Sequence, residues 1–418
     1  GRAPPPAWTR SASQHLDVET SGLPAQTPAA PGAEGAADRR AGSGEGTATS
    51  MQGAAASPAL PPAVESELRD VLGYSGTADA LVDEGLLPSN VCTPESAAHL
   101  NRIGAGLFAM HQYDVALIMF THAQSMESML SGGSIPGKPM TLTNIGGVYT
   151  TLGRYDEAMA TYTTALRLAE TDEERTYTNH NLAALKVKMG QLEDALDLMM
   201  NVLRVRIQQH GEEHERVAEE RSGIGMVLNS LGRPSEALPY LRDALRQQRL
   251  LLPPRSEALG VTCNNLALSL AALASRQDSP ESRGEAMACF AEARDIFEDA
   301  GRVLRRAEVL HNMAGVHRDA GELGDAIGLL REALAAREER LEPDHPEVAA
   351  SLVGLGEALC EQSSFDEASR LLERALRIRR KTLPEEHARV VSVKNALRTA
   401  LEALQREVQQ RASSVEVL

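Results

Sequence analysis

An internal repeat constrains the fold of this chain more than any other feature of its sequence. Seven copies of a helical pattern are each anchored on an Ala, which in most copies follows Glu or Asp. The anchor residues are Ala116, Ala158, Ala195, Ala237, Ala286, Ala326 and Ala368. Chains with such periods bury apolar surface by stacking neighbouring units, so the repeat predicts an elongated array rather than one globular core.

The clearest copy occupies residues 139–172, "PMTLTNIGGVYTTLGRYDEAMATYTTALRLAETD". Gly146 and Ala158 are small residues that allow two helices to approach closely, and Ala165 lies where the next unit docks. This pattern resembles the tetratricopeptide repeat, a helix–turn–helix unit of about 34 residues. The resemblance extends over residues 97–410 and implies an all-α fold, a right-handed α-solenoid of helix–turn–helix repeats.

Several copies recur at 42 residues, as between Ala116 and Ala158 or Ala326 and Ala368. The stretch 344–381, "DHPEVAASLVGLGEALCEQSSFDEASRLLERALRIRRK", resembles the repeats of kinesin light chains. That family also carries an N-terminal heptad region that joins the motor. Residues 1–96 have no sustained a/d heptads, which weighs against attachment to a motor heavy chain.

The stretch "HGEEHERVA" at 210–218 contains H-x-x-E-H, a pattern of zinc peptidases. That chemistry needs His210 and His214 on one helix, and Gly211 disfavours a helix there. His345 and His387 stand at the same place in later copies, each three residues before a Val, without a second His. We therefore predict a connection between repeats, and a metallohydrolase built on His210 and His214 is an unlikely alternative.

Composition divides the chain into five segments. The predicted organisation is a Pro/Gly/Ala/Ser-rich disordered tail at 1–62, a short helical lead-in at 63–96, seven repeats at 97–387, a capping helix at 388–410 and a flexible end at 411–418. Met51 is a candidate start, which would make residues 1–50 extraneous. Within the fifth repeat, "ASRQDSPESR" at 274–283 predicts a longer surface loop.

Charge and targeting features limit the partners. The net charge of −16 opposes binding to nucleic acid or anionic lipid, so we expect a basic or neutral protein or peptide partner. No apolar run approaches 18 residues, and no basic segment precedes an apolar signal-like run. These features predict a cytoplasmic protein without a membrane span.

Function is predicted on the concave side, where the first helix of each repeat would lie. Asn recurs there at one phase of the helix although it is a mediocre helix former. The candidate peptide-binding residues are Asn101, Asn144, His180, Asn181, Asn264, Asn265, His311, Asn312 and Arg318. Their amides could bond the backbone of an extended peptide, as the resemblance implies, or they could bridge neighbouring helices.

The sequence therefore predicts a non-catalytic scaffold or adaptor, with a kinesin-light-chain-like cargo adaptor as its most specific form. The alternative is an assembly or regulatory subunit that uses the convex face and the tail. No phosphate-binding loop or catalytic motif accompanies the repeats, so no enzyme activity, metal or cofactor is predicted.

Overall fold

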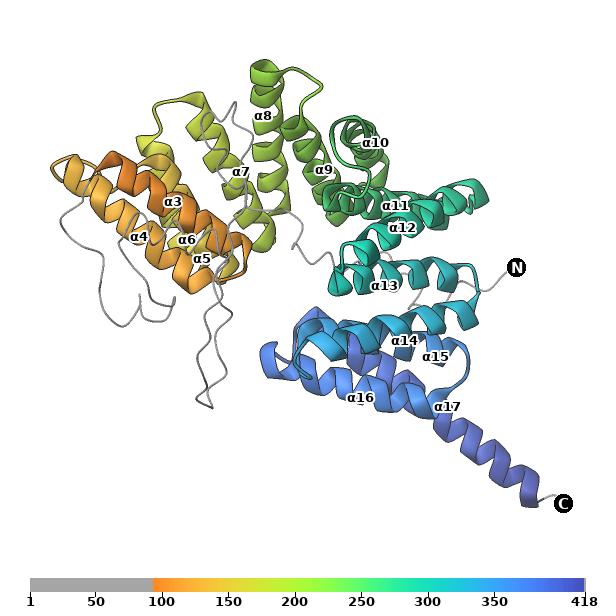
Figure 1. The fold of residues 1–418 in the computed structure, drawn as a ribbon. Coiled ribbons are helices and arrows are strands. Elements are labelled where there is room, and N and C mark those ends of the chain that lie inside the picture. The colour runs from red at the N-terminus through yellow and green to blue at the C-terminus, as the bar shows by residue number, and fades with distance from the viewer. Residues whose placement is uncertain (1–92, 417–418) are drawn as a thin grey trace, which may run out of the picture. The chain divides into compact units, whose positions relative to one another are not determined.

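The computed structural model describes residues 93–416, with side chains described to residue 410. These residues form α-helices joined by short connections and contain no strand (Figure 1). Backbone contacts divide the chain at Leu198 and Met199 into two compact units, which are treated separately below. The predicted tail at 1–62 and most of the lead-in at 63–96 lie outside the described residues.

The unit that ends at Leu198 contains the shorter run of helices. Its helices are α3 (Pro94–Ala109), α4 (Tyr113–Leu130), α5 (Pro139–Thr151), α6 (Tyr155–Leu168), α7 (Asp172–Lys188) and the first part of α8 (Leu192–His210). The unit that begins at Met199 contains the rest of α8 and nine further helices. These are α9 (Glu215–Ser230), α10 (Pro234–Leu251), α11 (Glu257–Gln277), α12 (Pro280–Asp299), α13 (Val303–Asp319), α14 (Leu323–Arg340), α15 (Pro346–Glu361), α16 (Phe365–Thr382) and α17 (Ala388–Glu416).

Consecutive helices pack in pairs, α3 with α4 and α5 with α6 in one unit, and α9 with α10 through α15 with α16 in the other. The seven anchor Ala residues of the repeat are fully buried. A Cβ added to Gly146 would lie 2.6 Å from Cε1 of Tyr162, and one added to Gly225 would lie 2.3 Å from Cγ of Leu241. The small residues are therefore required for close packing, and the predicted all-α solenoid of helix–turn–helix repeats is confirmed.

Two parts of the sequence prediction differ from the structure in the extent of the helices. The predicted loop at 274–283 is wrong, because α11 continues to Gln277 and α12 begins at Pro280. Only two residues separate these helices, and Asp278 adopts a left-handed conformation with φ of 50°. The last helix, α17, begins at Ala388 and continues to Glu416, beyond the predicted end at residue 410.

Helix α11 is long and apolar enough to cross a membrane by length and composition alone, with 67% of its most apolar window buried in the protein. It packs against α9, α10, α12 and α13. Burial against four neighbouring helices accounts for its apolar sequence, as in the core helix of a repeat array.

The repeated His residues cap the starts of helices. Helix α8 ends at His210, Gly211 follows with φ of 83°, and His214 is the N-cap of α9. The backbone N–H of Arg216 donates to Nδ1 of His214 at 3.1 Å. Equivalent bonds reach Nδ1 of His345 from Glu347 at 3.2 Å and Nδ1 of His387 from Arg389 at 3.2 Å. The stretches around His214, His345 and His387 are thus helix starts.

An Arg eight residues before each capping His fixes the same connection. Nη1 of Arg206 donates to the carbonyl of Arg216 at 3.0 Å, Nη1 of Arg337 to that of Glu347 at 3.3 Å, and Nη1 of Arg379 to that of Arg389 at 2.7 Å. Each Arg lies on a second helix, and each acceptor lies in the first turn of the helix that follows. We call this His-and-Arg arrangement the linker clamp.

Candidate functional site

The candidate site is the face formed by the first helices of the repeats, here called the first-helix face. In one unit it comprises α3, α5 and α7, and in the other α9, α11, α13 and α15. Successive first helices contact each other within each unit. Side chains between them therefore face both a neighbouring helix and any ligand that lies along the array.

In the unit that ends at Leu198, short polar side chains join neighbouring first helices. Nδ2 of Asn101 donates to Oγ1 of Thr141 at 2.8 Å, and the Tyr177 hydroxyl donates to Oδ1 of Asn144 at 2.9 Å. Nδ2 of Asn181 donates to the carbonyl of Tyr177 within its own helix at 2.9 Å. Each of the three Asn side chains thus already makes a bond inside the protein.

The unit that begins at Met199 uses the same device. Nδ2 of Asn312 on α13 donates to Oδ1 of Asn264 on α11 at 3.1 Å. Nδ2 of Asn229 on α9 donates to the backbone carbonyl of Asn265 at 2.8 Å. The hydroxyls of Ser222 and Thr262, 2.7 Å apart, add a second link between α9 and α11. Polar residues of this face therefore help to hold the repeats together.

Exposure divides the nine predicted peptide-binding residues. The buried members are Asn144, His180, Asn181, Asn264 and Asn265. The partly exposed members are Asn101, His311, Asn312 and Arg318. A hydrogen bond joins Asn264 of α11 to Asn312 of α13, and Arg318 of α13 acts electrostatically on His311. Asn265 also lies on α11, whereas Asn101, Asn144, His180 and Asn181 belong to the other unit. Peptide binding by the set stays a prediction, and the partly exposed members are better placed for it.

His311 is the most perturbed group of this face. Its Nδ1 atom is buried without a hydrogen-bond partner, although the side chain as a whole is partly exposed. A Cβ added to Gly354 of α15 would lie 2.9 Å from its Cε1 atom, so the ring packs against the next repeat. Burial, followed by the nearby Arg337 and Arg318 guanidinium groups, lowers the pKa of His311 to about 3. His311 is therefore a neutral side chain at physiological pH.

Two acidic residues of this face were missing from the sequence prediction. Nη1 of Arg318 donates to Oε2 of Glu357 at 2.9 Å, and its Nε atom lies 3.8 Å from Oε1 of Glu361. Burial raises the pKa of Glu361, Arg318 opposes that rise, and the carboxylates of Glu357 and Asp319 add to it. The available signal was the four-residue spacing of Glu357 and Glu361, which places both on one side of α15.

A family model for the tetratricopeptide repeat matches residues 95–171, 174–249 and 305–381, more than half of the chain. The chain belongs to the tetratricopeptide repeat family. The unmatched span between the second and third segments holds α11 and α12, which at 21 and 20 residues are longer than the other paired helices. The fifth TPR unit is thus the one that departs most from the family pattern.

The curated relatives are distant. KINESIN LIGHT CHAIN-RELATED 2 from Arabidopsis thaliana is 22% identical over 261 residues, which cover 59% of this chain and 37% of that protein. Outer dynein arm-docking complex subunit 4 from Homo sapiens is 26% identical over 141 residues, 34% of this chain and 19% of that protein. The matched region thus covers 37% of the first relative and 19% of the second. The resemblance to kinesin light chain repeats is confirmed.

Among solved structures, the apo form of the quorum sensor NprR from B. thuringiensis aligns with a TM-score of 0.54 and 18% identity. The alignment covers 75% of this chain and 86% of NprR. At this identity the likeness supports the TPR fold and carries no information about a ligand.

The His pair of the H-x-x-E-H stretch lacks the geometry of a zinc peptidase. The His210 and His214 rings stack with centroids 4.3 Å apart, but α8 ends at the first and α9 begins after the second. Nδ1 of His214 accepts the capping bond from Arg216. A different group in the TPR array, formed by His317, Glu322 and Asp325, has ligand atoms within 4.8 Å of one another.

Proposed function

We propose that this TPR protein is a non-catalytic scaffold that binds an extended segment of a partner protein along the first-helix face of α11, α13 and α15. The observation that carries the proposal is the partly exposed set Asn312, Arg318, Glu357 and Glu361 on neighbouring first helices. These polar groups lie on successive first helices. A peptide that crosses the helices could therefore form a hydrogen bond or an ion pair at each repeat.

A basic or neutral segment suits this surface. Glu361 is a half-buried carboxylate beside Glu357, and Arg318 is the cation that faces both. A Lys or Arg of the partner would relieve the repulsion between the two carboxylates and gain a charge-assisted hydrogen bond. The net charge of −16 favours the same class of partner over nucleic acid or anionic lipid. We also propose a cytoplasmic location.

The more specific proposal is a cargo adaptor similar to kinesin light chains. Its support is the 42-residue repeat together with the distant relatives of that name. Whether a motor heavy chain is bound depends on regions other than the TPR units. We propose adaptor activity for the TPR array alone.

The test compares two double variants in pull-downs with the full chain, followed by mass spectrometry. Glu357→Gln with Glu361→Gln changes the first-helix face, and Glu338→Gln with Glu367→Gln makes the same charge change on the second helices α14 and α16. Proteins that are captured by the wild type and the control but not by the first variant would be compared for a shared sequence segment. Synthetic peptides of that segment should then bind with at least tenfold weaker affinity to the first variant, measured by fluorescence anisotropy.

The predicted Asn residues are tested in the same way. Asn144→Ala, Asn181→Ala and Asn312→Ala together should weaken peptide binding if their amides reach the ligand. Partners that persist in every first-helix variant would contradict the proposal and support an assembly subunit that uses its outer face. In that case the exposed Leu250 at 71% and Met129 at 65%, both near the ends of second helices, would be the next residues to change.

A further inference from the structure

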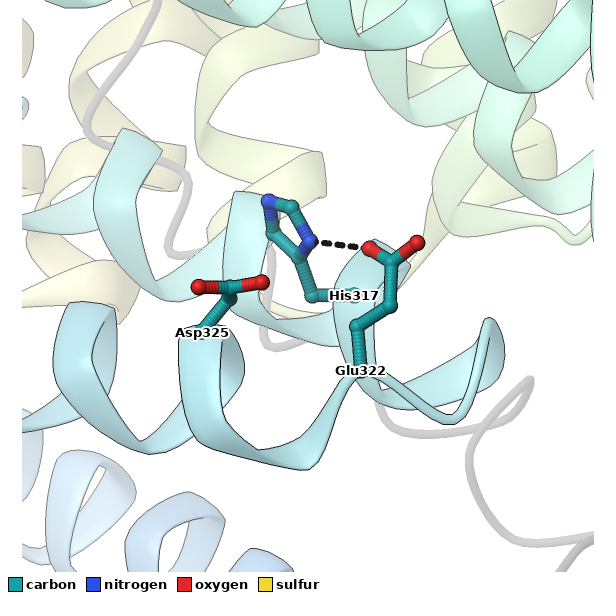
Figure 2. Close-up of side chains that lie close together, drawn as sticks. All are labelled: His317, Glu322 and Asp325. Carbon is teal, nitrogen blue, oxygen red and sulfur yellow. Dashed lines mark hydrogen bonds and ion pairs between the residues drawn. The ribbon is translucent and has the colours of Figure 1, made fainter.

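The turn between α13 and α14 brings three metal-ligating side chains together. His317 lies in the last turn of α13, Glu322 is the N-cap of α14 and Asp325 lies in its first turn. Nδ1 of His317 is 2.6 Å from Oε2 of Glu322, and Asp325 lies on the neighbouring turn (Figure 2). The ligand atoms of all three residues lie within 4.8 Å of one another.

The third repeat offers an internal comparison, because Lys186, Gln191 and Asp194 have the same spacing. There the Nζ atom of Lys186 is 3.0 Å from Oε1 of Gln191 and 2.8 Å from Oδ2 of Asp194. The side chain of Lys186 is 19% exposed and that of His317 is 21% exposed, so the two turns are similarly open. A positive charge thus occupies the centre of this turn in the third repeat.

In other repeats, the carboxylate at the position of Asp194 and Asp325 also pairs with a cation. Nε of Arg154 lies 2.5 Å from Oε2 of Glu157 in the second repeat, and Nη2 of Arg233 lies 2.6 Å from Oε2 of Glu236 in the fourth. Each Arg stands at the position of Gln191 and Glu322. The turn is therefore built around one cation in the second, third and fourth repeats.

The sixth repeat lacks that cation. His replaces the Lys of the third repeat, and Glu322 replaces the Arg or Gln, so two carboxylates now flank one imidazole. Among the described residues, Asp325 forms no ion pair with a Lys or Arg. Two carboxylates and an imidazole nitrogen, with ligand atoms within 4.8 Å of one another, can together coordinate a divalent cation. Such a set should bind the ion more tightly than a single imidazole.

We propose that His317, Glu322 and Asp325 bind a first-row divalent cation, with Zn²⁺ as the probe. The ion takes the place that the Lys186 ammonium occupies in the third repeat, and water completes its coordination. It joins the end of α13 to the start of α14 and thereby stabilises the helix pair that carries Asn312 and Arg318. The inference is independent of peptide binding, because its measurement contains no partner.

The first test is isothermal titration of the full chain with ZnCl₂, supported by thermal unfolding with and without the ion. The wild type should bind one equivalent and unfold at a higher temperature with Zn²⁺, because the ion binds the folded state preferentially. His317→Lys with Glu322→Gln copies the third repeat, so this variant should fold normally and lose that equivalent. Glu322→Gln alone should reduce the affinity at least tenfold.

The second test transfers the site. Lys186→His with Gln191→Glu copies the sixth repeat into the third and should add a second equivalent of Zn²⁺. His210→Ala controls for the stacked His210–His214 pair and should leave the number of sites unchanged. Absence of stoichiometric Zn²⁺ in the wild type would overturn the proposal, as would equal binding by the variant that carries both His317→Lys and Glu322→Gln.

Discussion

The connection from α6 to α7 in one unit differs from three connections in the other. Helix α6 has 14 residues, and three residues lead from it to α7, whose N-cap Thr171 forms a capping box with Glu174. Helices α10, α14 and α16 each have 18 residues and are followed by five-residue connections. His345 and His387 then cap the next helices, and an Arg from the preceding helix completes each linker clamp.

The packing within a repeat and the connection to the next repeat depend on different residues. The packing of a first helix on its second helix uses the same small residues in both units, as Gly146 and Gly225 illustrate. The extra length of the 42-residue repeats lies in the second helix and its connection, where polar residues satisfy the backbone of the next helix start. Changes to a clamped connection should therefore cost more stability than changes to a short one, and changes to the packing should affect both units equally.

The largest effect is expected from Arg206→Met. Arg206 lies 3.2 Å from Oε1 of Glu220, whose side chain is fully buried. Its loss leaves that carboxylate without its Arg and should reduce the free energy of unfolding by about 3–5 kcal/mol. Arg175→Met removes the exposed counterpart in the short connection, a 2.8 Å bond to the carbonyl of Ala169, and should cost about 1 kcal/mol. Urea unfolding followed by circular dichroism measures both, and similar losses would contradict the comparison.

Gly146→Leu and Gly225→Leu test the shared packing. Each new side chain would enter space held by Tyr162 or Leu241, so each should destabilise the protein by about 1–3 kcal/mol through overpacking. Gly147→Ala is a control, since the nearest atom to an added Cβ there is the Tyr162 hydroxyl at 3.9 Å. A large loss for only one of the two Leu variants would show that the units do not share a common packing.

His311 gives the unit that begins at Met199 a specific response to acid. Its pKa is about 3 in the folded protein and near 6.5 when unfolded, so the unfolded chain binds more protons between these values. Stability is therefore present above pH 6.5 and falls as the pH decreases, by about 1.4 kcal/mol per pH unit at most. His311→Gln should flatten the dependence between pH 6.5 and 5, measured by urea unfolding. An unchanged slope would show that His311 is not held neutral.

The smallest effects concern the caps. His345→Ala and Thr171→Ala each remove an acceptor from a helix start and should cost about 1 kcal/mol. His345→Asn should restore part of the loss, because its amide oxygen can accept the same backbone bond. Thermal unfolding resolves differences of this size. If His345→Ala leaves the stability unchanged, Arg337 alone would hold this linker clamp together.

The fold followed from the sequence because its signals are local. Small residues such as Gly146 and anchors such as Ala158 recur at fixed positions, and each has a direct role in helix packing. The repeated His indicated a connection, and the Arg eight residues earlier was an available signal whose partner, a backbone carbonyl, has no sequence signature. The missed continuation of α11 reflects a Ser- and Pro-containing stretch in which Pro280 starts a helix.

The candidate site followed only in part. Helical periodicity placed Asn264 and Asn312 on the first-helix face, but periodicity gives no distance between successive first helices. The bond between these two side chains depends on that distance, as does the bond between Tyr177 and Asn144. The role of an amide as a structural link or as a peptide contact therefore depends on packing between repeats.

In the unit that begins at Met199, short side chains make several of the links between first helices, whereas long side chains link the second helices. Ser222 with Thr262 and Asn312 with Asn264 join first helices directly, whereas Arg242 reaches Glu285 and Arg331 reaches Glu367 through extended, exposed side chains. Long side chains can follow a moving partner through many rotamers, but a Ser–Thr pair cannot. We therefore expect the array to have mechanical directionality: under tension the second helices separate first, while the first-helix edge keeps its spacing and acts as the hinge.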